Sequence, residues 1–513
     1  MRMGWTVLLF LLGPGAAGAA CVGADTTGLY AGSATSSDGT RIEITLNLLC
    51  DDGRLAAQFF TSVGDFPGTD VKLEGDRLTL GFDTQAALGT IALERKGDAL
   101  AGTFDLAGDK GTASFVKTGP ALAKDAMTAR LDLTPGEWHQ DLAFFARELP
   151  RHHANAFFSL SREAFEAEIA ALDRRVDSAD GDEMFVGLQA IAKSIGDGHT
   201  GVVAPDDRRV MPLEIAKFGG AFRIVAAGPG LERALGTRIV RIGGMRIVEA
   251  WARARGLTPR GELEQLRREN ALVYLARGYA LHGLGITPSR EHALYTLVAD
   301  DGTSFTLDVA GLPPGADPAL KPVAPDRGLR NQDKDAALRC MDVGGATVYC
   351  AWRAYQDLAA RAKEMLALLD RTKARKLVVD MRDNGGGDNT VGYAQIVGPL
   401  KARADIDAKG HLYVLVGAET FSAAMNNAAQ FQDETNAILV GETIGEKPNS
   451  YQEPRQFRLP NSHLVVRAST LWYAFRKSGS NVVAPDKEII PTWDDVKAGR
   501  DPVLDWVLAQ TPP

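Results

Sequence analysis

The chain has 513 residues, of which 45% are apolar, 24% charged and 7% aromatic. This composition excludes a disordered chain, a collagen-like chain and a small disulfide scaffold. The formal net charge is -8 and no long block of basic residues occurs, so the sequence does not predict nucleic-acid binding. At about 100 to 200 residues per domain, the length predicts roughly three domains.

The N-terminus has the parts of an export signal. Arg2 precedes an apolar run from Trp5 to Leu12, and the small residues GPGAAGAA follow up to Cys21. We therefore expect residues 1–20 to be removed as a signal peptide. Cys21 directly after small residues also resembles a bacterial lipoprotein site, so a lipid anchor at Cys21 is the alternative. The apolar run is too short for a transmembrane helix, and no later stretch of about 20 apolar residues lacks charges, so no transmembrane segment is predicted.

The four cysteines of an exported chain are compatible with two disulfides. The simplest of the possible connectivities pairs Cys21 with Cys50 and Cys340 with Cys350. No C-x-x-C, H-E-x-x-H or EF-hand spacing occurs, and the histidines are scattered. We therefore expect no metal ion and no other cofactor.

Changes in hydrophobic periodicity divide the mature chain into segments, which together predict a multidomain α/β protein. Period-two alternation with turn dipeptides predicts an antiparallel β-domain, and helical periodicity follows it. After a Pro-rich stretch, apolar strands alternate with helices, which is typical of βαβ units and a mostly parallel sheet. The expected boundaries are 21–120 for the β-domain, 130–200 for a helical lead-in, 201–260 for a short module of strands and a helix, 261–310 for a helix and strand connector, 311–335 for the linker and 336–513 for the core.

Two loops of the core follow buried strands, where parallel sheets bind ligands. They are DMRDNGGGD, from Asp380 to Asp388, and GAETFSAA, which contains Ser422. A serine at a helix start is usually an ordinary N-cap. It also has the place of a nucleophile, since the amide of Ala423 would stabilise an oxyanion. Gly386 and Gly387 could supply a second amide donor, although most glycine clusters are plain turns.

A nucleophilic serine needs a base, and the sequence offers two. Lys447, in VGETIGEKPNSY, would act as a base only if burial lowered its pKa toward neutrality. His199, in SIGDGHTGVV, has a near-neutral pKa without any shift. Most lysines are solvated charges and most single histidines are structural, so the residues alone leave the choice open.

Together these motifs resemble the tail-specific, or C-terminal-processing, family of serine peptidases, whose wider clan includes the tricorn protease core. The glycine loop resembles D-x-R-x-N-x-G-G, FSAA has Ser422 in the nucleophile position, and VGETIGEKPN also matches. HHANAFF and IGDGHT resemble the histidine-using, tricorn-like branch. The likeness covers about residues 135–510. It departs from the family at Ile444, where Thr is expected, and near Ser478 to Asn481, where no acidic partner matches.

The resemblance implies a fold and a function. The fold is a βαβ serine peptidase core of the ClpP or crotonase-like type, with a helical lead-in and a short PDZ-like module within residues 201–260. The function is that of an exported serine endopeptidase of the bacterial periplasm or cell envelope, with secretion as the alternative, which acts on peptides or unfolded proteins.

The site residues also follow from the resemblance. Ser422 would attack, Lys447 or His199 would carry the proton, and the amides of Ala423, Gly386 and Gly387 would hold the oxyanion. The competing hypothesis is an envelope binding or scaffold protein that keeps the fold without the activity. The β-domain, residues 21–120, carries no catalytic cluster and is expected either to dock substrates or partners or to give structural support.

Overall fold

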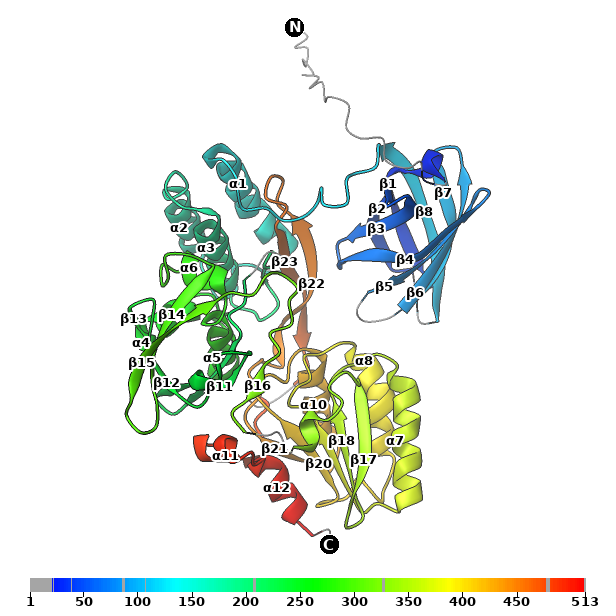
Figure 1. Ribbon diagram of the computed structural model, residues 1–513. Helices are drawn as coiled ribbons and strands as arrows, with labels where there is room; N and C mark the ends of the chain where they lie inside the picture. Colours follow the sequence, from blue (N-terminus) through cyan, green and yellow to red (C-terminus); the bar gives the residue numbers. More distant parts are fainter. Residues whose placement is uncertain are drawn as a thin grey trace. The chain divides into compact units, whose positions relative to one another are not determined.

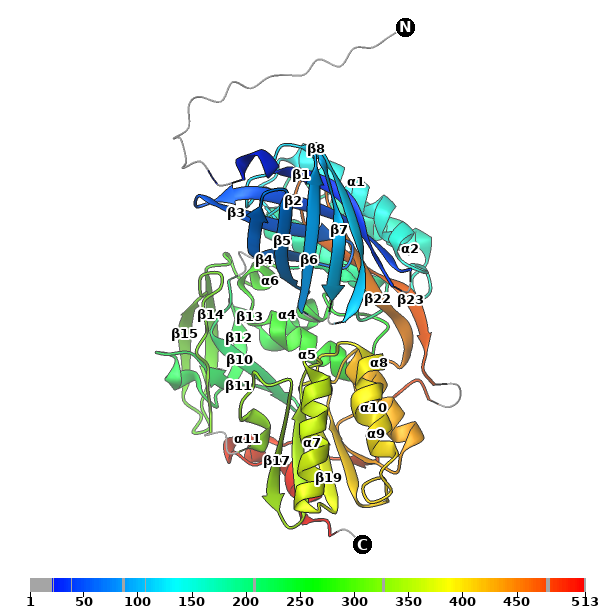
Figure 2. The same cartoon turned by 90° about the vertical axis from the view of Figure 1, so that its right-hand side faces the viewer.

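The computed structural model describes residues 21, 23–37, 39–84, 88–106, 108–205, 209–324, 328–476 and 480–511. The expected signal peptide, residues 1–20, lies outside the described residues. The chain divides into a first unit, Met1–Met127, and a second unit, Thr128–Pro513. Figure 1 and Figure 2 show the elements of both units from two directions. In the described part of the chain, no helix combines the length and the apolar character needed to cross a membrane.

The first unit is an antiparallel sheet that closes on itself (Figure 2, blue). Alternate side chains point inward and form an apolar interior that includes Leu78 and Phe115. Tight turns occur at Asp52-Gly53, Gly75-Asp76 and Gly97-Asp98, three of the turn dipeptides on which the prediction of this domain rests. The fourth, Asp38-Gly39, lies partly outside the described residues. The expected antiparallel β-domain is therefore confirmed. Its elements are η1 (Ala24–Thr26), β1 (Gly28–Ser36), β2 (Arg41–Asp51), β3 (Arg54–Thr61), β4 (Asp65–Glu74), β5 (Arg77–Asp83), β6 (Leu88–Lys96), β7 (Ala99–Leu106) and β8 (Asp109–Gly119).

The two expected cysteine pairs differ in state. Cys340 and Cys350 form a disulfide, with the sulfur atoms 2.09 Å apart, so this pairing is confirmed. Cys21 and Cys50 are free thiols. They are neighbours, because Cys21 has a hydrogen bond with Cys50, and burial raises the pKa of Cys21 to about 11. The second pair is thus close together without a disulfide bond.

The second unit begins with the helices that the sequence predicted, α1 (Pro135–His152), α2 (Arg162–Asp173) and α3 (Gly181–Ser194). Capping boxes start α1 and α3, in which the side chains of Thr134 and Asp180 accept from the amides of Glu137 and Glu183. The apolar faces of these helices pack into one core. The loop that leaves α3 carries His199.

An antiparallel sheet follows the helices, and we call residues 213–322 the strand module. Its order is β10–β11–β12–β14–β15, with β13 beside β12 and β16 beside β11. Residues 201–260 and 261–310, which the sequence divided, share this sheet, because β14 pairs with β12. The elements are β10 (Leu213–Phe218), β11 (Ala221–Ala227), η2 (Glu232–Ala234), β12 (Arg238–Ile242), β13 (Met245–Arg246), α4 (Ile247–Arg255), α5 (Glu264–Tyr274), α6 (Gly278–Gly283), β14 (His292–Val298), β15 (Ser304–Ala310) and β16 (Lys321–Pro322).

The core sheet has the order β17–β18–β19–β20–β21–β24, and it is parallel from β18 onward. Both faces are buried, with Val379 and Val414 on the side of α7 and α10, and Val378 and Leu415 on the side of α12 (Figure 1). This confirms the predicted alternation of strands and helices. The elements are η3 (Leu329–Asn331), β17 (Leu338–Gly344), β18 (Thr347–Trp352), α7 (Leu358–Thr372), β19 (Lys376–Asp380), α8 (Asn389–Gly392), η4 (Tyr393–Val397), α9 (Gly398–Lys401), β20 (Leu412–Val416), α10 (Ala423–Glu434), β21 (Ile438–Gly441), β24 (Lys487–Glu488), α11 (Trp493–Lys497) and α12 (Pro502–Ala509).

A long hairpin joins the core to the helices. β22 (Asn449–Arg458) and β23 (Val465–Ala474) pair antiparallel, and β9 (Gly201–Val202) pairs with β23. Figure 1 shows the hairpin, in orange, between the core sheet and α1. Because β9 follows His199 and β22 follows the VGETIGEKP segment, the hairpin brings these distant parts of the chain together.

Candidate active site

Ser422 lies between β20 and α10. Its backbone has φ 55° and ψ -126°, a conformation that costs energy for any residue except glycine. Its side chain makes no capping hydrogen bond to α10, so the ordinary N-cap interpretation does not describe it. Two bonds hold this turn against the glycine loop. The Phe421 amide donates to the Asn384 carbonyl at 3.0 Å, and the Thr420 hydroxyl donates to the Met381 carbonyl at 2.9 Å.

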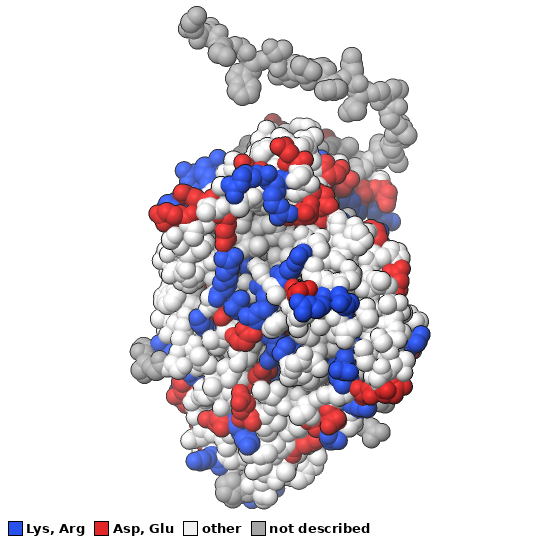
Figure 3. Space-filling model, turned by 90° about the vertical axis from the view of Figure 1, so that its left-hand side faces the viewer, with Lys and Arg blue, Asp and Glu red and all other residues white. Residues whose placement is uncertain are grey.

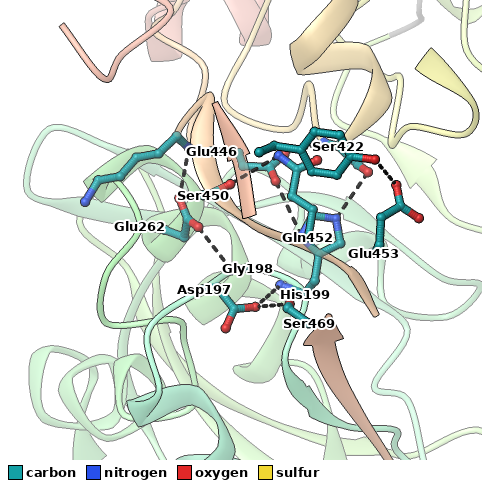
Figure 4. Close-up of polar contacts among 12 residues, drawn as sticks. Asp197, Gly198, His199, Glu262, Ser422, Glu446, Ser450, Gln452, Glu453 and Ser469 are labelled. Atoms are coloured by element: carbon teal, nitrogen blue, oxygen red, sulfur yellow. Dashed lines mark hydrogen bonds and ion pairs between the residues drawn. The ribbon is translucent and has the colours of Figure 1, made fainter. Parts of the chain in front are cut away.

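The hydroxyl of Ser422 meets the imidazole of His199. Oγ and Nε2 are 3.1 Å apart, within hydrogen-bond distance (Figure 4). The His199 side chain is only 9% exposed, and its ring stacks on Phe421 with centroids 4.6 Å apart. Burial lowers the pKa of His199 to about 4, so the imidazole is neutral at pH 7. A neutral imidazole in this position can accept the serine proton.

Glu446 lies on the other side of His199. One of its carboxylate oxygens is 3.5 Å from Nδ1 of His199, and the other accepts a hydrogen bond from the amide of Ser422 (Figure 4). Nδ1 and the nearer oxygen are buried, and neither has a hydrogen-bond partner among the described residues. Burial and the charge of Glu262 raise the pKa of Glu446 well above its usual value. An acid in this position favours the tautomer that leaves Nε2 free to accept a proton.

A second buried carboxylate, Asp197, fixes the loop that carries His199. One oxygen accepts from the amides of His199 and Thr200, at 3.1 and 2.7 Å. The same oxygen accepts from the Ser469 hydroxyl at 2.6 Å, and the other lies 3.0 Å from Nε2 of His153. Burial opposes ionisation, yet these bonds hold the pKa of Asp197 well below its usual range. The HHANAFF and IGDGHT motifs therefore meet in the fold.

Lys447 does not contact Ser422. Its amino group donates to the carbonyl of Gly261, and its backbone amide donates to Glu262 at 2.9 Å. Of the two bases that the sequence left open, the structure brings His199 to the serine and binds the Lys447 side chain elsewhere.

The glycine loop packs against the serine. A Cβ on Gly386, where φ is +106°, would stand 2.7 Å from Cβ of Ser422 and 3.2 Å from the amide nitrogen of Ala423, so glycine is required here. The Gly386 amide donates to the Asn384 side chain at 3.0 Å. The Ala423 amide is the first of α10 and has no acceptor within that helix. Gly387 follows in the same loop. Of the three expected oxyanion donors, Gly386 thus already has an acceptor.

The charged residues of the DMRDNGGGD motif support this loop. Arg382 forms ion pairs with Asp380 and with Asp501, both at 2.7 Å. The Tyr349 hydroxyl donates to Asp380 at 2.8 Å. Burial opposes ionisation of Asp380, but Arg382 lowers its pKa to about 2. These contacts tie the end of β19 to the start of α12.

One group of metal-ligand side chains occurs among the described residues. Asp180, Asp182 and His282 have ligand atoms within 4.8 Å of one another. Both carboxylate oxygens of Asp182 already accept hydrogen bonds from Arg290, and one of them lies 3.0 Å from Nδ1 of His282. The positive charge of Arg290 therefore stands where a cation would need to bind.

The acidic group beside His199 is Glu446 and does not come from the segment near Ser478 to Asn481, where the family resemblance places it. Glu446 directly precedes Lys447 in a motif already singled out for another reason. No local pattern marks Glu446 as buried, and its place in that motif is the signal that the sequence offers for it. For Asp197 the signal is its position two residues before His199 in IGDGHT.

Known proteins share this arrangement of elements. Residues 349–489 match the model of peptidase family S41. The tail-specific protease of Haemophilus influenzae is 29% identical over 182 residues, which are 30% of this chain and 26% of that protein. Among solved structures, mature CPAF complexed with lactacystin has a TM-score of 0.52 at 12% identity, over 73% of this chain and 97% of that chain. The photosystem II D1 C-terminal processing protease has a TM-score of 0.35 at 15% identity, over 69% and 93%.

These matches show what this chain is similar to. The fold is a mixed helix and sheet fold like that of mature CPAF. Residues 349–489 resemble peptidase family S41, and the predicted resemblance to tail-specific serine peptidases is confirmed. The chain spans about a quarter of the length of the curated relative it matches, so its own activity and substrates have to be argued from the site.

Proposed function

We propose that this protein is an exported serine peptidase that cleaves peptides or unfolded proteins, with Ser422 as nucleophile and His199 as general base. The observation that carries the proposal is the 3.1 Å contact between Oγ of Ser422 and Nε2 of His199, with Glu446 on the far side of the ring. A serine, a histidine and an acid in this order recur on unrelated folds and perform acyl transfer.

The chemistry follows from this geometry. His199 takes the proton of Ser422 as Oγ bonds to the carbonyl carbon of the substrate and a tetrahedral intermediate forms. The Ala423 amide, at the positive end of α10 and beside the glycine loop, stabilises the oxyanion. The imidazolium then protonates the leaving amine, which departs and leaves an acyl-enzyme. Water hydrolyses this ester, with His199 again as the base, and Glu446 stabilises the imidazolium each time it forms.

A fluorophosphonate serine probe and unstructured peptides test the proposal. The protein without residues 1–20 should be labelled and should cleave, and Ser422→Ala should lose both, with turnover lower by about 10⁴-fold or more. His199→Ala should also lose both activities. Lys447→Ala is the matched control, which removes the other possible base and should keep turnover. A folded wild-type protein that is neither labelled nor active would favour the binding or scaffold protein.

We also propose the finer assignment of the fold, a ClpP or crotonase-like core with a PDZ-like strand module. The module has a pocket of about 550 Å³ whose lining includes Lys217, Arg255, Arg260 and Arg267. Lys and Arg side chains gather in the middle of the face drawn in Figure 3. Such a pocket fits a substrate carboxylate. Peptides with a free C-terminus should have a lower KM than amidated ones, and equal KM values would exclude this role.

Export to the periplasm or cell envelope, with secretion as the alternative, is supported by the N-terminal sequence and by the Cys340–Cys350 disulfide, since disulfides persist in oxidising compartments. The mass of the mature N-terminus distinguishes simple cleavage near Cys21 from lipid modification of Cys21. A protein that keeps residues 1–20 and remains in the cytoplasm would contradict export.

A further inference from the structure

The loop between α4 and α5, residues 256–263, touches both segments that supply the proposed base and its acid. The Gly261 amide donates to the carbonyl of Gly196 at 2.9 Å, in the loop that carries His199. The Leu263 amide donates to the carbonyl of Gly445 at 3.1 Å, next to Glu446. This part of the strand module therefore bridges two segments that are far apart in the sequence.

Glu262 lies at the centre of the bridge. One of its carboxylate oxygens accepts from the amide of Gly198 at 3.1 Å, and the other accepts from the amide of Lys447 at 2.9 Å (Figure 4). Gly198 directly precedes His199, and Lys447 directly follows Glu446. Glu262 is only 7% exposed, so both hydrogen bonds lie in the interior, where a bond to a charged group is strong.

We propose that Glu262 is a positioning residue that holds His199 and Glu446 at the separation required for proton transfer. The inference rests on the proposed function and extends it, because Glu262 belongs to the strand module and not to the core. It acts through the backbone on either side and does not touch Ser422.

The carboxylate suits this role better than a neutral side chain would. It offers an acceptor to each amide, whereas a glutamine would accept from one amide and turn its NH2 group toward the other. The pKa of Glu262 is raised to about 7, because burial and repulsion by Asp197 disfavour its charge. The hydrogen bonds from the amides of Lys447 and Gly198 act in the opposite direction. The charge of Glu262 in turn opposes ionisation of Glu446. The other charged groups that face this site are Asp197, Lys193, Arg467 and the side chain of Lys447.

The test compares Glu262→Gln with Glu249→Gln, a matched control in α4 whose side chain forms an exposed ion pair with Arg246. For Glu262→Gln we expect kcat to fall by about 10- to 100-fold, as for other residues that orient catalytic groups, with little change in KM. The acid limb of the pH profile should move to lower pH, because loss of a neighbouring negative charge lowers the pKa of Glu446. Glu249→Gln should leave kcat and the acid limb unchanged.

Glu262→Asp serves as the second variant. It keeps the charge but is too short for both amides, so kcat should fall while the acid limb stays in place. Hydrogen exchange gives a readout that does not need activity, in which peptides that contain Gly198 and Lys447 should exchange faster in both variants. An inactive wild-type protein would contradict the proposed function. Hydrogen exchange would then still test whether Glu262 holds the segments that contain Gly198 and Lys447. Unchanged exchange, wild-type kcat, or a fall in kcat/KM that comes mainly from KM would overturn the positioning role.

Discussion

The two sides of the His199 loop each hold a buried carboxylate, and the two are in opposite electrostatic states. Asp197 accepts hydrogen bonds from two amides and a hydroxyl and lies against His153, and its pKa is low. Glu446 accepts from one amide and has Glu262 nearby, and its pKa is raised. Burial is nearly complete for both, so the hydrogen-bond donors and the sign of the neighbouring charge, His153 beside Asp197 and Glu262 beside Glu446, decide the difference. Asp197 is a permanent structural charge, whereas Glu446 becomes charged only at a higher pH than an ordinary glutamate does.

The largest effect that would sharpen this comparison is on turnover in Glu446→Gln. The amide cannot stabilise the imidazolium and can hold His199 in the wrong tautomer, so kcat should fall by about 10³- to 10⁴-fold. Steady-state cleavage of a fluorogenic peptide measures this. A fall of less than tenfold would mean that His199 works without Glu446.

Asp197→Asn should instead act mainly on stability. The substitution removes a buried charge that lies 3.0 Å from His153, which typically costs about 3 to 5 kcal/mol. Denaturant unfolding at pH 7 measures the loss. Because the folded pKa of Asp197 is depressed, its contribution is present above the unfolded pKa of about 3.9 and disappears as the pH falls through the folded value. Equal stability of mutant and wild type would contradict the fixed-charge interpretation.

At alkaline pH, Glu446→Gln should change the free energy of unfolding in the direction opposite to Asp197→Asn and make the protein more stable. A carboxyl group whose folded pKa is raised destabilises the fold as the pH rises above the unfolded pKa of about 4.3, because the unfolded state ionises more easily. Glu446→Gln should therefore unfold at a higher denaturant concentration than wild type at pH 8, with a smaller difference at pH 4. A mutant that is less stable at pH 8 would indicate a fixed charge at Glu446 as well.

The pH profile of the wild type should show which group limits activity in acid. His199, with a pKa of about 4, would be neutral down to mildly acidic pH, so an acid limb well above this value would report ionisation of Glu446. The residual activity of Glu446→Gln should then have its limb at lower pH. A wild-type limb near pH 4 would assign the limit to His199.

The smallest effect is expected for Lys447→Ala. Its amino group binds the carbonyl of Gly261 and not the serine, so kcat should change by less than about threefold. Loss of this hydrogen bond should cost about 0.5 to 1.5 kcal/mol in the free energy of unfolding. A loss of activity as large as that of Ser422→Ala would restore Lys447 as the base.

The local parts of the site could be predicted from the sequence. A buried strand, a loop and a helix start surround Ser422, and consecutive glycines mark the neighbouring loop, so both are visible within short windows. The choice between Lys447 and His199 could not be predicted from the sequence. His199 and Ser422 are 223 residues apart, and only long-range packing brings them together. Glu446 was missed because burial gives a glutamate its role, and nothing local fixes burial.

The limits of the strand module show the same effect on a larger scale. The hydrophobic periodicity changes near residue 260, which predicts a domain boundary there. The pairing of β12 with β14 crosses that boundary, because the helices α4, α5 and α6 interrupt the chain but not the sheet. Long-range strand pairing therefore defines the module and is absent from any short window.

The hairpin β22–β23 also determines the distance between His199 and the other residues of the site. β9 begins at Gly201, just beyond His199, and β22 begins at Asn449, just beyond Glu446, so both groups are attached to one small sheet. Each residue advances a strand by about 3.3 Å, so a slip of one step between β9 and β23 would carry the imidazole out of reach of Ser422. An insertion or deletion in the tip of the hairpin, residues 459–464, that shifts β22 against β23 would likewise move Glu446 relative to His199.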